Sequence, residues 1–258
     1  MISGLRWFEG KKMVSFVRGG DYAHPGDEVL INKALERFSK SQDRSILDVG
    51  CGLGGTAHYI QKQGWGRVTG VDIEEISIQY AKETYPEVEF YTSDVMVTSD
   101  VLKGKKFDLI CLFSSFYSFA NQLGALKELS KIASENAALV IFEYTDLSGG
   151  RSQQIQVDNK NLFSLPVDKS NFKNMLTMSN WKYVDSVNLD EESEKWYEEL
   201  VKSFERKRKQ IIEIFGIDVY QRGYDRYLEI YSAFKSKIMG ASIFYARYSP
   251  GDITVSTT

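Results

Sequence analysis

Between Ser45 and Tyr144 the chain alternates short runs of apolar residues with longer amphipathic stretches. Short apolar runs bounded by turn residues predict buried strands, and the longer stretches predict helices. The predicted strands span residues 45–49, 67–73, 88–92, 107–113 and 138–144, and the predicted helices span 56–63, 75–84 and 123–133. Strands that alternate with helices in this way predict βαβ units around a parallel sheet.

The pattern changes after residue 146. Residues 147–168 are polar and irregular and contain Gly149, Gly150 and Pro166, which predicts a loop insertion. A helix at 170–179 and strands at 182–187 and 241–248 then bring the number of predicted strands to seven. Between the last two strands lies a long helical stretch, 190–238, which we expect to form a cap.

The most informative segment is ILDVGCGLGGT, residues 46–56, where an apolar strand leads through a glycine-rich turn into a helix. Gly50 and Gly52 allow a sharp turn and a close approach of the backbone to a ligand, and the helix start presents free N–H groups. Gly50, Gly52 and Gly55 also have the G-x-G-x-x-G spacing of dinucleotide sites, and Asp72 follows at the end of the next strand. Because of this spacing, a nicotinamide-dependent oxidoreductase remains an alternative function.

Two acidic residues argue against a pyrophosphate ligand. Asp48 precedes the glycine turn by two residues, and Asp94 follows the third predicted strand. Carboxylates repel phosphates but attract a cation, such as a sulfonium nucleoside with a free amino group. We therefore favour a positively charged nucleoside cofactor.

The ordered motifs LDVGCGLGG, VTGVDI, SDV and FDLICL, over about residues 40–145, resemble those of class I S-adenosylmethionine-dependent methyltransferases. This resemblance implies an α/β, Rossmann-like doubly wound, mostly parallel seven-stranded sheet with an antiparallel last strand. It also implies that Asp72 holds the ribose hydroxyls, that Asp94 and the backbone of Val95 bind the adenine, and that Ile73 packs on the adenine face. The other implied cofactor-binding residues are Asp48, Gly50, Cys51, Gly52, Gly54 and Phe113.

The resemblance also suggests three parts and a type of acceptor. Residues 1–40 would form a helical segment over the cofactor, 41–146 the cofactor-binding core, and 147–258 the rest of the sheet with the insertion and cap. The segment LFSSFYSF lacks the Asn-Pro-Pro-Tyr pattern of enzymes that methylate base or glutamine amides. We therefore expect a small-molecule acceptor, an amine or a hydroxyl compound.

Candidate catalytic residues are His24, Tyr22 and Tyr117. His24 sits in a Pro-Gly turn and could act as a general base, since imidazole titrates near neutral pH. For the acceptor we expect Phe116, Tyr117, Tyr224 and Tyr227. The two last tyrosines belong to an aromatic stripe at helical spacing, which would either form a wall for a cationic amine or simply pack the cap onto the sheet.

The composition of the chain excludes several classes of function and partner. The chain has 258 residues with 32 Lys and Arg against 35 Asp and Glu, a net charge of −3 that argues against nucleic acid as a partner. Two cysteines suggest neither a disulfide framework nor a metal site, and no apolar run is long enough to cross a membrane. We expect a cytoplasmic protein, and a homodimer is compatible with this composition. A non-catalytic S-adenosylmethionine-binding protein and a macromolecule methyltransferase stay open.

Overall fold

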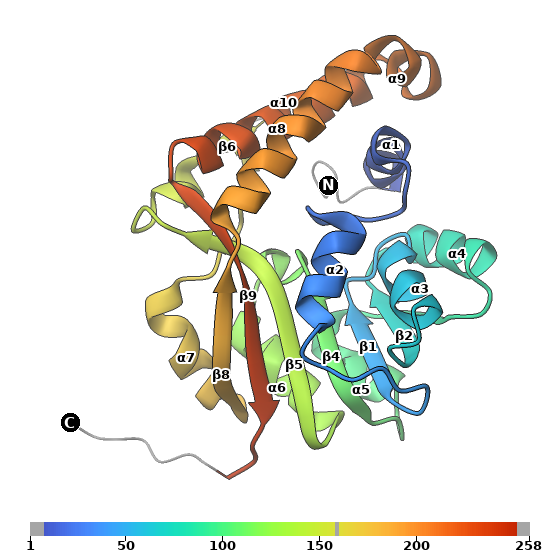
Figure 1. Ribbon diagram of the computed structural model, residues 1–258, viewed down its shortest axis with the longest axis vertical. Coiled ribbons are helices and arrows are strands. Elements are labelled where there is room, and N and C mark those ends of the chain that lie inside the picture. Colours follow the sequence, from blue (N-terminus) through green and yellow to red (C-terminus); the bar gives the residue numbers. More distant parts are fainter. Residues whose placement is uncertain (1–7, 158–159, 252–258) are drawn as a thin grey trace.

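A computed structural model describes residues 8–157 and 160–251, so the outermost residues of the predicted first and last parts lie outside it. Its main sheet has seven strands in the order β3-β2-β1-β4-β5-β9-β8 (Figure 1). The strands are β1 Ser45–Val49, β2 Arg67–Asp72, β3 Glu89–Thr92, β4 Phe107–Phe113, β5 Ala133–Asp146, β8 Trp181–Asn188 and β9 Met239–Tyr248.

The strand directions confirm the predicted Rossmann-like fold. Neighbouring strands from β3 through β5 pair in parallel, whereas β9 is antiparallel to both β5 and β8. Chain order reverses between β1 and β4, because the chain runs outward from β1 to β3 and then returns to the other side of β1. Open α/β sheets bind ligands beyond the carboxyl ends of the strands at such a switch point.

Helices cover both faces of the sheet. One face carries α2 (Asp27–Leu35), α3 (Gly55–Lys62) and α4 (Glu75–Thr84), and the other carries α5 (Thr98–Val101), α6 (Gln122–Lys131) and α7 (Lys169–Thr177). Successive strand residues point to opposite faces, so Ile46 and Leu47, neighbours on β1, belong to two different apolar clusters. This is why the strands are apolar almost throughout.

The predicted cap consists of three helices, α8 (Asp190–Arg206), α9 (Arg208–Phe215) and α10 (Ile217–Lys235). The chain breaks at Lys207 and again at Gly216, whose φ of 85° is outside the helical range. Helices α8 and α10 lie side by side across the upper end of the sheet in Figure 1, and α1 (Phe8–Arg18) contacts all three cap helices. The N-terminal helix and the cap therefore cover the same end of the sheet.

The segment predicted as an irregular loop contains more structure than expected. A short 3-10 turn at Arg151–Gln154 precedes a two-stranded hairpin of β6 (Gln156–Val157) and β7 (Lys160–Asn161). Two further 3-10 turns, Val95–Val97 and Phe116–Ser118, follow β3 and β4. Among the described residues no helix is long and apolar enough to span a bilayer. The division into parts at residues 40 and 146 stays a prediction.

Candidate active site

The glycine turn is fixed between the ends of β2 and β4. The backbone N–H groups of Gly50 and Cys51 both donate to the carbonyl of Val71, at 2.7 and 3.0 Å. Gly50 has a φ of 77°, and a Cβ there would lie 2.4 Å from the Cβ of Ser115. The Ser115 hydroxyl donates to the carbonyl of Val49 at 2.7 Å, so this contact is held in place. Only glycine fits at this position.

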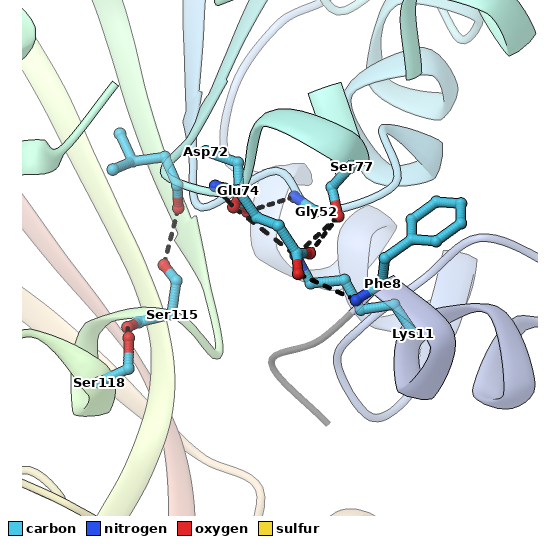
Figure 2. Close-up of polar contacts among 9 residues, drawn as sticks. Phe8, Lys11, Gly52, Asp72, Glu74, Ser77, Ser115 and Ser118 are labelled. Atoms are coloured by element: carbon cyan, nitrogen blue, oxygen red, sulfur yellow. Dashed lines mark hydrogen bonds and ion pairs between the residues drawn. The ribbon is translucent and has the colours of Figure 1, made fainter. Parts of the chain in front are cut away.

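Asp72 connects the glycine turn to the end of β2. Its Oδ2 accepts a hydrogen bond of 2.8 Å from the backbone of Gly52, and its Oδ1 accepts one of 2.9 Å from Glu74 (Figure 2). Lys11 on α1 approaches the same cluster, with Nζ 3.0 Å from Glu74 Oε2 and 3.6 Å from Asp72 Oδ1. Sequence reasoning did not identify Lys11 or Glu74, because neither belongs to a motif. The N-terminal helix is thus tied to the predicted ribose site by an ion pair.

Ile73, Asp94 and Val95 gather at the next edge of the site. Ile73 follows Asp72 and is 64% exposed, an unusual position for an apolar residue so close to the core. Asp94 Oδ1 accepts from the backbone of Met96 at 2.9 Å, whereas its second carboxylate oxygen accepts no hydrogen bond from the residues that the structure describes. An accessible apolar face beside an available acceptor suits an adenine ring and its amino group.

Asp48 is buried beneath the glycine turn. Desolvation, and then the nearby charge of Asp72, raise the pKa of its carboxyl to about 7. Its Oδ2 atom has no hydrogen-bond partner among the described residues. Ser114, at the end of β4, has a φ of 54° and a buried hydroxyl that likewise lacks a partner there. A left-handed conformation at a residue other than glycine is often kept at a functional site.

A cavity of about 530 Å³ extends from this turn to the cap. It unites eleven of the residues that the sequence pointed to, and the other five do not line it. The lining set is Tyr22, His24, Gly50, Gly52, Asp72, Ile73, Asp94, Val95, Phe113, Tyr117 and Tyr227. The set away from the cavity is Asp48, Cys51, Gly54, Phe116 and Tyr224.

Local geometry explains why some of these residues do not reach the cavity. Phe116 lies in a 3-10 turn that directs its ring to the opposite apolar cluster, where it packs edge-on against Phe172. The hydroxyl of Tyr224 donates to Glu205 at 2.7 Å on the exterior of the cap. The thiol of Cys51 is buried, and burial raises its pKa, so it is an unreactive packing group.

His24 lines the cavity but has both ring nitrogens engaged. Nδ1 lies 3.0 Å from the carbonyl of Pro25, which can only accept, so Nδ1 carries the proton. Nε2 accepts from the Thr56 hydroxyl at 3.0 Å. Burial, and then the charge of Arg18, lower the pKa of His24 to about 3. In this geometry the imidazole is neutral and its acceptor nitrogen is occupied, which does not suit the expected role of general base.

The cap end of the cavity is lined by aromatic side chains. Tyr117, Tyr144, Tyr197 and Tyr227 come from four different elements, and the hydroxyls of Tyr144 and Tyr197 share a hydrogen bond. Glu143, buried in β5, accepts from the backbone of Tyr117 and of Tyr144, each at 2.9 Å. Burial raises the pKa of Glu143 to about 8, although these hydrogen bonds oppose the shift. It therefore fixes the turn that presents Tyr117.

Comparison with known proteins gives the family. The sequence profile described as "Methyltransferase domain" matches residues 22–186. A putative methyltransferase, 235L, of invertebrate iridescent virus 6 is 29% identical over 108 residues, which cover 42% of this chain but only 40% of the viral protein. The phosphoethanolamine N-methyltransferase of Plasmodium falciparum is 22% identical over 215 residues, 81% of this chain and 80% of that protein.

Solved structures share the fold. A phosphoethanolamine N-methyltransferase of Haemonchus contortus, in complex with phosphomonomethylethanolamine and S-adenosylhomocysteine, superposes with a TM-score of 0.78. The superposition covers 94% of this chain and 58% of that chain, at 15% identity. Likeness at this identity supports the fold alone. Because the family profile matches well over half of the sequence, the chain belongs to the methyltransferase domain family, that of the class I S-adenosylmethionine-dependent methyltransferases.

Proposed function

We propose that this methyltransferase transfers the methyl group to a small-molecule acceptor that reacts through an amine or a hydroxyl group. The supporting observation is a single cavity of about 530 Å³ that joins the glycine turn to an aromatic end beneath the cap. Pockets of this size suit small molecules, and α1 and the cap helices cover it. The Plasmodium relative, by its name, acts on a small amine, which agrees with this proposal.

The residues at the turn fit S-adenosylmethionine. Asp72 retains lone pairs for ribose hydroxyls, Ile73 offers an apolar face, and Asp94 has a free carboxylate oxygen for the adenine. Asp48 lies beneath the turn, outside the cavity, so we assign it to supporting the loop. The unpartnered Ser114 hydroxyl is a further group that a ligand would satisfy. When bound, the cofactor supplies a methyl group activated by its sulfonium.

The chain's own contribution is positioning. Well-oriented reactants recover about 7–11 kcal/mol of the barrier in such displacements. Tyr117 and Tyr227 orient the acceptor, while Tyr22 and the neutral His24 close the side of the cavity next to α3 and exclude water. Because His24 is not placed to take up a proton, an amine that arrives uncharged is the favoured nucleophile.

Labelling experiments test this proposal. The purified chain is incubated with methyl-labelled S-adenosylmethionine and panels of small amines, hydroxy compounds, RNA and protein, and products are separated by size. We expect label on a small amine or hydroxyl compound. Label only on RNA or protein would support a macromolecule methyltransferase, and cofactor binding without any transfer would support a non-catalytic protein. Either result contradicts the proposal. The predicted cytoplasmic location, the homodimer and the absence of nucleic-acid partners stay predictions.

A further inference from the structure

One cationic side chain in the cavity has no counter-ion. Arg226 on α10 lines the cap end, where its Nη2 donates to the hydroxyl of Tyr117 at 3.3 Å. It forms no ion pair with any carboxylate of residues 8–157 and 160–251. Its surroundings are the neutral phenols of Tyr117, Tyr144, Tyr197 and Tyr227.

Such an arrangement leaves most of the guanidinium donors free for a ligand. Guanidinium is charged at every working pH and presents five donors, of which one contact to a phenol oxygen uses only one. Arg226 is only half-buried and lines the cavity, so donors that the phenol does not engage remain available to a ligand there. These unused donors at the cavity indicate that an anion would complete the site.

The other cations of the cavity differ from Arg226. Arg18 is paired with Asp27 and stacks on Trp196, with its guanidinium carbon 4.3 Å from the ring centroid. Lys11 is paired with Glu74 near the glycine turn. Four acids line the cavity, and each lies on the loop after α1 or at or just beyond the ends of β2 and β3: Asp21, Asp72, Glu74 and Asp94. The cavity is therefore acidic at the cofactor end and positive at the cap end.

We propose that Arg226, with the hydroxyls of Tyr117 and Tyr227, forms an oxyanion subsite that binds a carboxylate or phosphate monoester on the acceptor. Arginine binds both groups through paired N–H donors. Tyr227 lines the cavity, and its hydroxyl has no hydrogen-bond partner among the described residues, so it is free to donate to a ligand. The inference rests on the proposed function, and it replaces the expected wall for a purely cationic amine with a site for an acceptor that also carries a negative group.

Calorimetry with matched ligands tests the subsite. The full chain, saturated with S-adenosylhomocysteine, is titrated with ethanolamine, phosphoethanolamine and β-alanine, which share an amine but carry a hydroxyl, a phosphate or a carboxylate. Inorganic phosphate is titrated with and without the nucleoside. We expect one of the two anionic amines to bind about 10- to 100-fold more tightly than ethanolamine, as expected for charge-assisted hydrogen bonds. Which of the two binds more tightly identifies the anion. Equal binding of all three overturns the inference.

Variants assign the effect to the residue. Arg226→Met should remove the preference for the anion and leave the affinity for S-adenosylhomocysteine within about twofold. Arg222→Met, an exposed arginine one turn earlier on the same helix, is the matched control and should retain the preference. If Arg226→Met does not fold, Arg226→Lys keeps the charge without the paired donors and should lose part of the preference. An unchanged preference in either Arg226 variant, or an equal loss of nucleoside affinity, contradicts the subsite.

The two proposals fail in different ways. Absence of S-adenosylhomocysteine binding to the unmodified chain would contradict the proposed function, whatever the anions do. Nucleoside binding together with methyl transfer to an uncharged amine, and no anion preference, would contradict the subsite alone.

Discussion

The Oδ2 atom of Asp72 accepts a hydrogen bond of 2.8 Å from the backbone nitrogen of Gly52. The carboxylate that we expect to bind a ribose therefore also holds the glycine turn. Its other oxygen, Oδ1, accepts a hydrogen bond from the backbone of Glu74. One side chain therefore links the cofactor-binding loop, the end of β2 and, through Lys11, the N-terminal helix.

Replacement of Asp72 should affect binding and stability together. Asp72→Ala removes two hydrogen bonds to a charged acceptor, each worth about 1.5–3 kcal/mol. We expect the affinity for S-adenosylhomocysteine in calorimetry to fall by at least about tenfold and the free energy of unfolding to fall as well. Asp43→Asn, an exposed acid, is the control and should change neither. Undiminished nucleoside affinity in Asp72→Ala would exclude Asp72 from the cofactor site.

Alanine substitutions at two glycines with nearly equal φ distinguish the cost of backbone strain from the cost of a steric clash. Gly50 and Gly64 have φ of 77° and 78°, but a Cβ at Gly64 meets nothing within 4 Å, whereas one at Gly50 meets Ser115. Gly64→Ala should cost about 1–2 kcal/mol, the usual cost of a left-handed residue. Gly50→Ala should cost a further 1–3 kcal/mol or so for overpacking and should weaken nucleoside binding. Urea unfolding of both variants measures this, and equal losses would mean that the loop moves away from Ser115.

His24 should influence stability more than chemistry. Its pKa of about 3 in the fold lies below its ordinary 6.5, so the unfolded chain takes up a proton that the native state does not as the pH falls below 6.5. The burial of neutral His24 therefore does not lower the free energy of unfolding well above pH 6.5. Well below pH 6.5 this free energy falls by about 1.4 kcal/mol per pH unit. Between pH 6.5 and 5.5 the unfolding free energy of the unmodified chain should therefore fall by about 1 kcal/mol relative to that of His24→Asn, because half of the unfolded chains already carry the proton at pH 6.5.

The same variant tests catalysis. Removal of a general base lowers rates by about 10²–10⁴, whereas we expect kcat of His24→Asn to fall by less than about tenfold. A larger loss that is accompanied by the disappearance of an acidic limb from the pH profile would restore His24 as the base.

Glu143 should show the opposite pH dependence. Its pKa of about 8 in the fold exceeds the ordinary 4.5, so its favourable contribution is complete below pH 4.5 and is lost as the pH rises to 8. Glu143→Gln does not titrate. The stability difference between the unmodified chain and this variant should therefore shift toward the variant by about 1.4 kcal/mol per pH unit between pH 5.5 and 7.5. A constant difference would mean that Glu143 is ionised throughout.

The sequence predicted those parts of the site that depend on local chemistry. The strand, glycine turn and helix around Gly50 are encoded within eleven residues, and the acid at the end of the next strand has a fixed place in such a fold. What it did not predict depends on packing between distant segments. Phe116 and Tyr117 are neighbours, yet the 3-10 turn sends one to the opposite core and the other to the cavity.

The site residues that the sequence pattern did not predict are mainly charged. Arg226 lies within a tyrosine-rich helical stripe, where a charge is ordinarily on the solvent side, and periodicity alone does not say which side faces a cavity. Glu143 had a readable signal, since it interrupts the apolar run ALVIFEY of a central strand. A carboxylate there is buried unless the strand assignment is wrong, and buried charges need a purpose.

Tyr224 and Tyr227, three residues apart on α10, provide a matched pair for the acceptor site. The Tyr224 hydroxyl bonds Glu205 outside the cavity, whereas Tyr227 lines the cavity. Tyr227→Phe should raise the KM for the acceptor by about 12- to 160-fold, the value of one hydrogen bond to a charged group, with unchanged nucleoside affinity. Tyr224→Phe should leave KM within about twofold, although it loses its bond to an exposed carboxylate. If both variants behave alike in steady-state assays and differ only in thermal stability, the stripe serves to pack the cap and the acceptor lies elsewhere in the cavity.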